Sequence, residues 1–376
     1  MEPIGIVGTG FVADLYMRSL ATFPSLKVAS AFDIDEQRCA AFCHHWKILQ
    51  TRSLEEFLWG GPEQPRLVLN LTNPSSHFDV SLACLQAGRH VYSEKPLALD
   101  MKSAQALRDL AAEKSLLLAS APCSVLGEAA QTLWLAIRKE AVGQVHLVYA
   151  ELDDDFISQA PFKKWRSESG APWPYRDEFV VGCTLEHAGY YLTWLIAMFG
   201  SVKKVVAASA TLIQDKLEDC AQTGPDYSCA TLFFESGIVA RLTCSIVAPH
   251  DHSLRIFGDK GVLEVARSWD NDAPIRLRRR YTIRRKLLNS PITKRIKIKT
   301  TSHPKVGRWG AAAMNFALGP AEMLNSLQEA RPCRLSADFA LHLNEVTLAI
   351  QSSNGVQHMR TVSPPIEPMS WAKNLK

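Results

Sequence analysis

The chain has 376 residues, a formal net charge of +4 and a mean hydropathy of −0.05. With 47% hydrophobic and 21% charged residues, its composition is that of an ordinary globular protein, which excludes a disordered, collagen-like or coiled-coil chain. Because a usual domain has roughly 150 residues, we expect two domains.

The most apolar stretches, such as residues 190–199, are shorter than the roughly 20 residues of a membrane-spanning helix, and no secretion signal is recognisable. The nine cysteines are scattered and form no CxxC pair, which favours reduced thiols. We therefore expect a cytoplasmic protein. Cys39, Cys43, His44 and His45 could form half of a zinc site, but no second ligand pair lies nearby, so we predict no bound metal.

The N-terminus is typical of a dinucleotide-binding turn. Residues 4–7 form an apolar run that predicts a buried strand, and a helical pattern continues to residue 20. Between them, Gly8 permits a tight turn and Gly10 allows the backbone to approach a pyrophosphate, while Ala13 takes the place of a third glycine. We expect the cofactor to contact Gly8, Gly10, Phe11 and Val12.

A second strand, predicted at residues 27–32, ends at Asp33. A carboxylate at this position accepts hydrogen bonds from a ribose 2′-OH and repels a 2′-phosphate, and Ile34 supplies no cation for that phosphate. The sequence therefore favours NAD over NADP. The alternative is that Asp33 only caps the helix that begins near Glu36.

Three more strands are predicted at residues 66–71, 89–93 and 116–119, with helical segments between them. This alternation indicates a doubly wound parallel sheet, a Rossmann domain over residues 1–122. Ligands bind beyond the carboxyl ends of such strands. The candidate site loops therefore contain Thr72, Asn73, Glu94 and Lys95.

From about residue 145 the pattern changes to longer strands without helices between them. We predict strands at residues 145–152, 202–212, 228–235, 237–246, 253–257 and 261–265. Helices at 313–329 and 336–352 follow. This pattern indicates an α+β domain over residues 123–376, built on a large, mostly antiparallel open sheet through which we expect a homo-oligomer, a dimer or tetramer, to form.

Residues 276–299 contain eleven Lys or Arg and no acid, so the rest of the chain is net acidic. Such a strip could bind phosphate, nucleic acid or an anionic membrane. The alternative is a solvated hairpin whose edges are protected by charge. We favour the hairpin, peripheral to any active site, and expect no nucleic-acid partner.

Several motifs, in the same order, resemble the Gfo/Idh/MocA family of nicotinamide-dependent sugar and inositol oxidoreductases. They are the GxGxxA turn, the TNPxxxH loop that ends at His77, the Glu-Lys-Pro triplet at 94–96, and the segments 182–191 and 316–322. The resemblance implies that Lys95 lies near the nicotinamide and the substrate hydroxyl, that Glu94 and His77 help to hold the cofactor, and that Pro96 is often cis.

Most members of the family carry an aspartate and, four residues later, a histidine in a second catalytic motif. Here these positions look like His187 and Tyr191. Some members use a tyrosine at the later position as acid/base, so the resemblance implies this role for Tyr191. The role of His187 stays open: it could relay a proton, contact the substrate or only fill space in the packed interior.

The residue chemistry agrees with this interpretation. Residues four apart share a helix face, and a neighbouring Lys95 ammonium would lower the pKa of a tyrosine. Glu186 and Tyr190 project about 100° round the helix from His187 and Tyr191, and they are the second candidates for the acid/base role. The alternative is a buried helix at 184–199 whose tyrosines only reach the surface with their hydroxyls.

Residues 164–175 are rich in aromatic residues, Gly and Pro, which suits either a substrate lid or a rigid connector. Trp165, Arg166, Trp173 and Glu186 are the candidate substrate contacts, with Glu168 as a further polar candidate.

Two functions remain open. The first is an NAD-dependent dehydrogenase or reductase that acts on a neutral or anionic sugar, cyclitol or related polyol. The second is a non-catalytic dinucleotide-binding sensor or scaffold, because a fold does not by itself establish a function.

Overall fold

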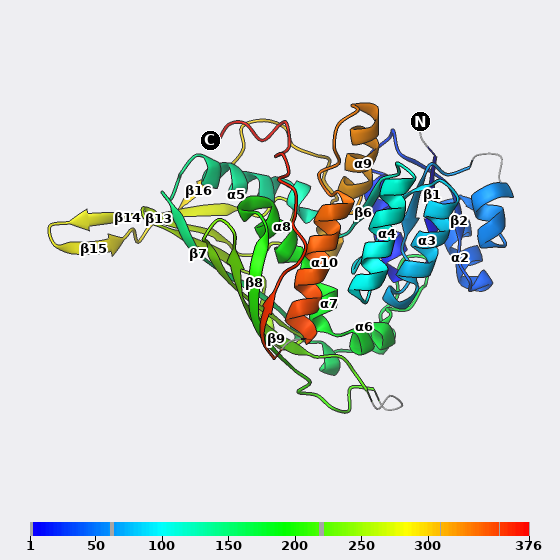
Figure 1. Ribbon diagram of the computed structural model, residues 1–376, viewed down its shortest axis with the longest axis horizontal. Coiled ribbons are helices and arrows are strands. Elements are labelled where there is room, and N and C mark those ends of the chain that lie inside the picture. Colours follow the sequence, from blue (N-terminus) through cyan, green and yellow to red (C-terminus); the bar gives the residue numbers. More distant parts are fainter. Residues whose placement is uncertain (1–2, 61–63, 218–221, 309, 353, 376) are drawn as a thin grey trace.

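The computed structural model describes residues 3–60, 64–217, 222–308, 310–352 and 354–375. Two β-sheets lie along the long axis of the molecule, each with its own helices (Figure 1). The N-terminal sheet is parallel and the C-terminal sheet is mostly antiparallel, which confirms the expected fold class.

The first sheet has six parallel strands in the order β3-β2-β1-β4-β5-β6. They are β1 (Pro3–Val7), β2 (Lys27–Phe32), β3 (Leu49–Gln50), β4 (Leu67–Asn70), β5 (His90–Ser93) and β6 (Leu118–Ser120). The strands β4 and β5 are buried at every residue, as expected for strands covered on both faces. The strand order reverses between β1 and β4, and the crevice beyond their carboxyl ends is where such folds bind ligands.

Four helices cover this sheet: α1 (Phe11–Leu20), α2 (Glu36–Trp46), α3 (His77–Gln86) and α4 (Met101–Glu113). The apolar sides of α1 and α2 belong to the core of one face, and those of α3 and α4 to the core of the other. Asp35 caps α2 by accepting a hydrogen bond from the Arg38 amide. The alternative that Asp33 caps this helix is therefore wrong.

The second sheet has eleven strands, and its main path is β15-β14-β13-β12-β7-β10-β9-β8-β17. Its strands are β7 (Val145–Phe156), β8 (Val202–Ala210), β9 (Tyr227–Phe234), β10 (Val239–Ser245), β11 (Val247–Asp251), β12 (Leu254–Gly258), β13 (Gly261–Val265), β14 (Ile275–Ile283), β15 (Lys286–Asn289), β16 (Lys294–Ile296) and β17 (Gly355–His358). Only β7 and β10 pair in parallel. All six strands predicted for this region are present.

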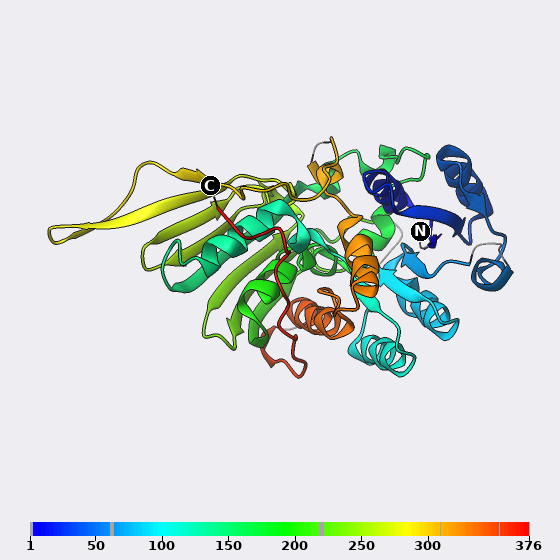
Figure 2. The same cartoon turned by 90° about the horizontal axis from the view of Figure 1, so that it is seen from above.

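The remaining helices are α5 (Glu128–Arg138), α6 (Tyr175–Val181), α7 (Cys183–His187), α8 (Gly189–Phe199), α9 (Leu318–Gln328) and α10 (Ala337–Ser352). The helices α5, α8 and α10 lie on one face of the large sheet (Figure 2). The helix predicted to begin at residue 313 begins at Leu318, because residues 310–313 form a short 3-10 turn.

Part of the C-terminal region returns to the first sheet. The helix α10 packs against α4, and its Ala340 and Leu341 share a core with Leu107. In α9, Gly319 lies against the Tyr92 ring so closely that a Cβ atom would come within 2.4 Å of it. The division of the chain at residues 122 and 123 therefore stays a prediction.

The eight described cysteines are free thiols, and Cys220 lies outside the described residues. On α2, Cys39 and Cys43 face the core, whereas His44 and His45 are exposed. The four side chains therefore do not converge on one point. No helix in the part of the chain that the structure describes is long and apolar enough to span a bilayer.

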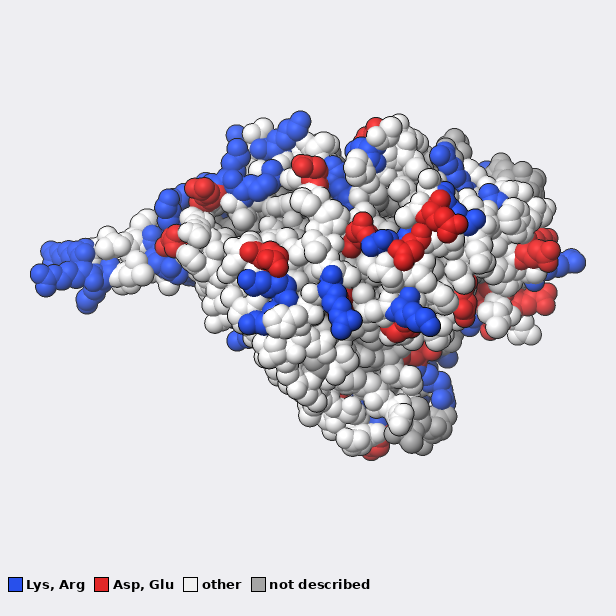
Figure 3. Space-filling view, in the orientation of Figure 1, with Lys and Arg blue, Asp and Glu red and all other residues white. Residues whose placement is uncertain are grey.

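The basic strip forms the hairpin β14–β15 and the neighbouring strand β16. The hairpin projects from the end of the large sheet, and Figure 3 shows Lys and Arg side chains gathered at its tip. Its residues 281–289 are all exposed, which confirms the predicted hairpin; that the strip has no binding partner stays a prediction.

Candidate active site

A cavity of about 740 Å³ lies between the two sheets, a size typical of a cofactor and substrate site. The carboxyl ends of β1, β4 and β5 form one wall, and α6, α7 and α8 contribute to the other. Nine of the ten residues expected to contact a cofactor line it: Gly8, Gly10, Phe11, Val12, Asp33, Thr72, Asn73, Glu94 and Lys95.

The glycine turn fits a dinucleotide. Gly8 has a φ of +93°, and a Cβ atom there would come within 2.6 Å of the backbone of Leu71. Gly10 is the N-cap of α1, and nothing lies within 4 Å of the position of its missing Cβ. This open space at a helix N-terminus can hold a pyrophosphate, whose charge the helix amides would stabilise.

Asp33 is held by five donated hydrogen bonds. Thr9 contributes its amide at 2.7 Å and its hydroxyl at 3.0 Å, the Asp35 amide lies at 2.9 Å, and Arg38 donates through Nη2 at 2.6 Å and Nε at 3.1 Å. Burial raises the pKa of Asp33, but the bonds from Arg38 and Thr9 outweigh it and hold this pKa below its ordinary value.

Arg38 places a cation beside Asp33, although the next residue, Ile34, supplies none, as predicted. Arg38 lies in the first turn of α2, five residues after Asp33, and lines the cavity with it. The sequence prediction considered only the next residue, Ile34, although one helical turn brings a residue farther along the chain to the same point.

His77, the tenth expected cofactor contact, does not line the cavity as the structure describes it. It is fully buried, with Nδ1 at 2.7 Å from the Pro96 carbonyl oxygen and Nε2 at 2.9 Å from that of Thr72. The side chain thus connects the two loops that follow β4 and β5. It positions these loops and has no direct access to a ligand.

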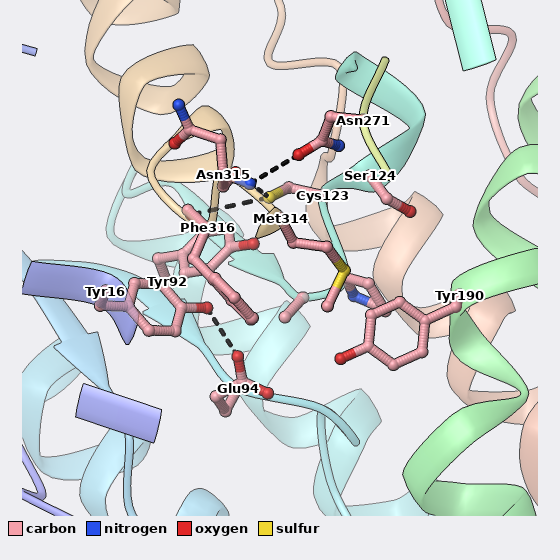
Figure 4. A pocket seen from close by; sticks show the side chains of 12 residues that line it. Tyr16, Tyr92, Glu94, Cys123, Ser124, Tyr190, Asn271, Met314, Asn315 and Phe316 are labelled. Atoms are coloured by element: carbon pink, nitrogen blue, oxygen red, sulfur yellow. Dashed lines mark hydrogen bonds between the residues drawn. The ribbon is translucent and has the colours of Figure 1, made fainter. Parts of the chain in front are cut away.

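Lys95 lies in the loop that follows β5, on the first wall, and its ion-pair partner is on α7 of the second. Its ammonium forms an ion pair with Glu186, and the peptide bond to Pro96 is cis, as the resemblance implied. The preceding Glu94 accepts hydrogen bonds from the Tyr16 hydroxyl at 2.7 Å and from the Lys95 amide at 3.1 Å. In Figure 4 the Tyr190 hydroxyl is directed toward the side on which Glu94 lies.

The structure does not bring Lys95 and Tyr191 together. Tyr191 is fully buried, its hydroxyl donates to the backbone carbonyl of His252, and it is not among the described residues that line the cavity. Tyr190, one residue earlier, lines the cavity with Lys95 and Glu186. The prediction that Tyr191 lies beside Lys95 is therefore wrong, and the second candidates, Glu186 and Tyr190, occupy that place.

Burial and neighbouring charges shift the pKa values of Lys95, Glu178 and Tyr190. Burial alone would lower the pKa of Lys95, but Glu186 and Glu178 hold it well above its ordinary value, so Lys95 is an ammonium. Burial, with Glu186 beside it, raises the pKa of Glu178 well above its usual range. Burial also raises the pKa of Tyr190, and Lys95 opposes this rise.

His187 lines the cavity, as expected for a site residue, but it belongs to a cluster that the sequence did not indicate. Its Nε2 lies 3.6 Å from Asp154 Oδ2, and His250 and His252 lie beside the same carboxylate. Asp154 lines the cavity as well. Because 96 residues separate Asp154 from His250, no local pattern could have predicted this cluster.

Of the residues at 164–175, Trp165 and Trp173 line the cavity, with ring centroids 5.0 Å apart. Arg166, also expected to contact the substrate, donates instead to the carbonyls of Lys163 and Trp165 and is not among the described residues that line the cavity. Its side chain therefore stabilises its own loop.

This segment is also tied to the first domain. The Ser169 hydroxyl donates to Asp14 on α1 at 2.7 Å, and Glu168 forms an ion pair with Arg18 at 2.9 Å. On the opposite side, Asn73 donates to Asp177 of α6 at 2.8 Å. These contacts close the segment over the glycine turn, which agrees with a lid.

Two family models match the chain. One, described as the oxidoreductase family with an NAD-binding Rossmann fold, matches residues 3–121, and the other, the GFO/IDH/MocA C-terminal domain, matches residues 130–264. A trans-1,2-dihydrobenzene-1,2-diol dehydrogenase of Mus musculus is 22% identical over 268 residues, which cover 70% of this chain and 74% of that protein. A UDP-N-acetylglucosamine 3-dehydrogenase of Acidithiobacillus ferrooxidans is 30% identical over 115 residues, 31% of this chain and 35% of that protein.

Solved structures have the same fold. A levoglucosan dehydrogenase, in complex with NADH and levoglucosan, superposes with a TM-score of 0.78 at 16% identity and covers 96% of this chain and 100% of its own. An oxidoreductase of Agrobacterium radiobacter, in complex with NAD+, L-tartaric acid and magnesium, superposes with a TM-score of 0.73 at 13% identity. The match covers 95% of this chain and 98% of the other. Because the two family models match both sheets of this fold in order, the protein belongs to the Gfo/Idh/MocA family and is an NAD-binding oxidoreductase.

Proposed function

We propose that the protein transfers a hydride between the nicotinamide C4 of NAD(H) and a carbon that carries a secondary alcohol or ketone. The substrate is a sugar, a cyclitol or a related polyhydroxylated metabolite. The observation that carries the proposal is the convergence of Lys95, Glu186 and Tyr190 on the wall of one cavity that also contains the glycine turn.

A nicotinamide cofactor held at the glycine turn and the loops after β4 and β5 would supply the hydride acceptor or donor. Tyr190 is the acid/base: in oxidation its phenolate oxygen takes the proton of the substrate hydroxyl and becomes a phenol, and in reduction the phenol gives that proton to the ketone oxygen. The Lys95 ammonium orients that oxygen and stabilises a phenolate on Tyr190. Glu186 fixes the ammonium through its ion pair.

The charges of the cavity favour a neutral polyol over an anion. Asp154, Asp177 and Glu186 line the same cavity as Lys95. An anionic group would meet these carboxyl groups with few cations to compensate. The two tryptophans of the lid offer flat apolar faces that suit the CH surfaces of a sugar ring. The names of the relatives, which include a scyllo-inositol 2-dehydrogenase (NADP+), also support a sugar-like alcohol.

NAD(H) is the proposed cofactor in preference to NADP(H). Asp33 would accept hydrogen bonds from the ribose hydroxyls, and its negative charge disfavours a 2′-phosphate. Arg38 reduces this preference, because it offers a cation beside the same carboxylate.

The test is turnover of sugars and cyclitols with NAD+ and NADH by the wild type and two variants. Tyr190→Phe is expected to lower kcat by about 10²- to 10⁴-fold, the usual cost of losing an acid/base group, while NADH binding measured by fluorescence is retained. Tyr191→Phe is the matched control and is expected to keep most turnover.

The opposite result, with Tyr191→Phe inactive and Tyr190→Phe active, would overturn the assignment. NADH binding by a wild type that turns over no polyol would favour the sensor or scaffold function instead.

A further inference from the structure

Asp154, His250 and His252 form a cluster at the wall of the cavity. Asp154 lies near the end of β7, and His250 lies on β11, which pairs with β7 so that Asp251 is opposite Asp153. This pairing places His252 Nε2 at 3.3 Å and His250 Nδ1 at 3.8 Å from Asp154 Oδ1. One potential ligand atom from each residue lies within 4.8 Å of those of the other two.

We propose that these three residues bind a divalent transition-metal ion of the Zn²⁺ type. Two imidazoles and one carboxylate are a ligand set that such ions accept, and three protein ligands leave a coordination position open for substrate or water. Bonds of about 2.0–2.2 Å place tetrahedral ligand atoms roughly 3.3–3.5 Å apart. The observed separations need only small side-chain rotations to reach this geometry.

The burial of His252 supports an ion. The residue is 2% exposed, and its Nε2 is directed at Asp154 Oδ1 at 3.3 Å without the geometry of a regular hydrogen bond. A buried polar atom without a partner is costly, and an ion at this point would satisfy His252 and Asp154 together.

The charge around the cluster favours a cation over an organic anion. Besides Asp154, the cavity is lined by Asp177 and Glu186, and Lys95 is already paired with Glu186. His250 is half-exposed on the outer side, which leaves a path for an ion to enter.

Neighbouring residues hold the ligands in position, as outer-shell partners of metal sites do. The carboxylate of Asp155 accepts a hydrogen bond from the His250 amide at 3.1 Å. The Tyr191 hydroxyl donates to the carbonyl of His252.

The cluster is one aromatic ring away from the proposed acid/base. The Trp269 ring lies 4.3 Å from the ring of His252 and 5.4 Å from that of Tyr190. Because Asp154 and Trp269 line the cavity, an ion bound to Asp154 would lie at its wall, where it could bind a hydroxyl oxygen of a polyol. This statement about the substrate rests on the proposed function, whereas the metal site itself does not.

The experiment is a titration of chelator-treated protein, without cofactor or substrate, with Co²⁺, followed by visible absorption and then by competition with Zn²⁺. One equivalent is expected to give the intense bands of a four-coordinate Co²⁺ ion. Asp154→Asn, His250→Gln and His252→Gln are each expected to weaken binding by more than about 100-fold, the upper range for the loss of an outer-shell partner. His146→Gln is the matched control, since this exposed histidine lies on β7 away from the cluster.

Thermal melting of the variants checks that they fold, and the half-exposed His250 makes His250→Gln the safest of them. Binding that all four variants retain would identify adventitious surface binding and overturn the proposal. Absence of Co²⁺ and Zn²⁺ binding in the wild type would overturn it too, as would binding of phosphate or citrate that strengthens in Asp154→Asn. These outcomes leave the Tyr190→Phe result untouched, so the two proposals can fail separately.

Discussion

Tyr190 and Tyr191 are neighbours in the chain, but their environments are opposite. The Tyr190 hydroxyl faces the cavity with Lys95, whereas that of Tyr191 is bonded to the backbone of His252. About 100° of helix rotation separates the two side chains, so the packing of α8 decides which of them meets a ligand.

The pH dependence of alcohol oxidation should report the ionisation of Tyr190. Because burial raises its pKa, we expect kcat/KM for oxidation to rise toward high pH. Lys95→Met removes a positive charge that lowers this pKa, so the rising limb moves to higher pH. Glu186→Gln removes a negative charge that raises it, so the limb moves to lower pH. Shifts of both variants in the same direction would contradict the assignment of Tyr190.

Asp33 and Arg38 should decide the choice of cofactor together. In Asp33→Ser the Arg38 guanidinium loses its carboxylate partner and becomes available to a 2′-phosphate, so we expect the ratio of Kd values to shift at least about tenfold toward NADP(H), equivalent to about 1.4 kcal/mol. Isothermal titration calorimetry with NAD(H) and NADP(H) measures this ratio. The double variant Asp33→Ser/Arg38→Ala is the control and should lose the shift toward NADP(H), because it lacks the guanidinium. NADP(H) binding by the wild type that is tighter than NAD(H) binding would refute the proposed preference.

At the scale of elements, residues 164–175, the proposed lid, contact both the aromatic residues around them and the helix α1. Its tryptophans pack into an aromatic cluster with Phe162 and Phe179, and Ser169 reaches across to α1. Asp14 accepts this bond while it also accepts one from the Trp46 indole at 2.6 Å. The lid is therefore anchored to the domain that contains the glycine turn.

Weakening this anchor should speed up cofactor release. Ser169→Ala removes a hydrogen bond worth about 1 kcal/mol, so we expect NADH to dissociate roughly fivefold faster, as measured by stopped-flow fluorescence. Lys164→Ala, an exposed change in the same segment, should leave the rate unchanged. Equal rates in all three proteins would show that the lid does not limit release.

At the scale of the whole molecule, the large sheet has one face toward the helices and one face without them (Figure 2). The second face carries half-buried aromatic residues beside cations, such as Tyr149 with Phe257 at 5.0 Å and Arg241 over the Tyr149 ring at 4.1 Å. Apolar surface of this kind is typical of a protein interface.

The expected homo-oligomer should therefore depend on this face. We expect analytical ultracentrifugation to give a dimer or tetramer for the wild type and a monomer for Phe257→Glu, because a buried unpaired carboxylate is costly at an interface. Val362→Glu, which changes an exposed apolar residue of the C-terminal tail, should keep the wild-type mass. A monomeric wild type would contradict the prediction.

Local sequence determined much of this protein. The glycine turn, the alternation of strands and helices, and the change to long strands near residue 145 predicted both sheets, because short-range periodicity and backbone preferences act within a few residues. The same patterns located the loops that contain Glu94 and Lys95. They also predicted the basic hairpin, since charge at an exposed strand edge is a local property.

Only the tertiary structure decided the rest. The phase of α8 placed Tyr190 rather than Tyr191 in the cavity, and the first turn of α2 brought Arg38 to Asp33. The pairing of β7 with β11 assembled Asp154 with two histidines from nearly one hundred residues away. Such contacts depend on how whole elements pack, and the free energy of that packing is distributed over the core and is not encoded in any short motif.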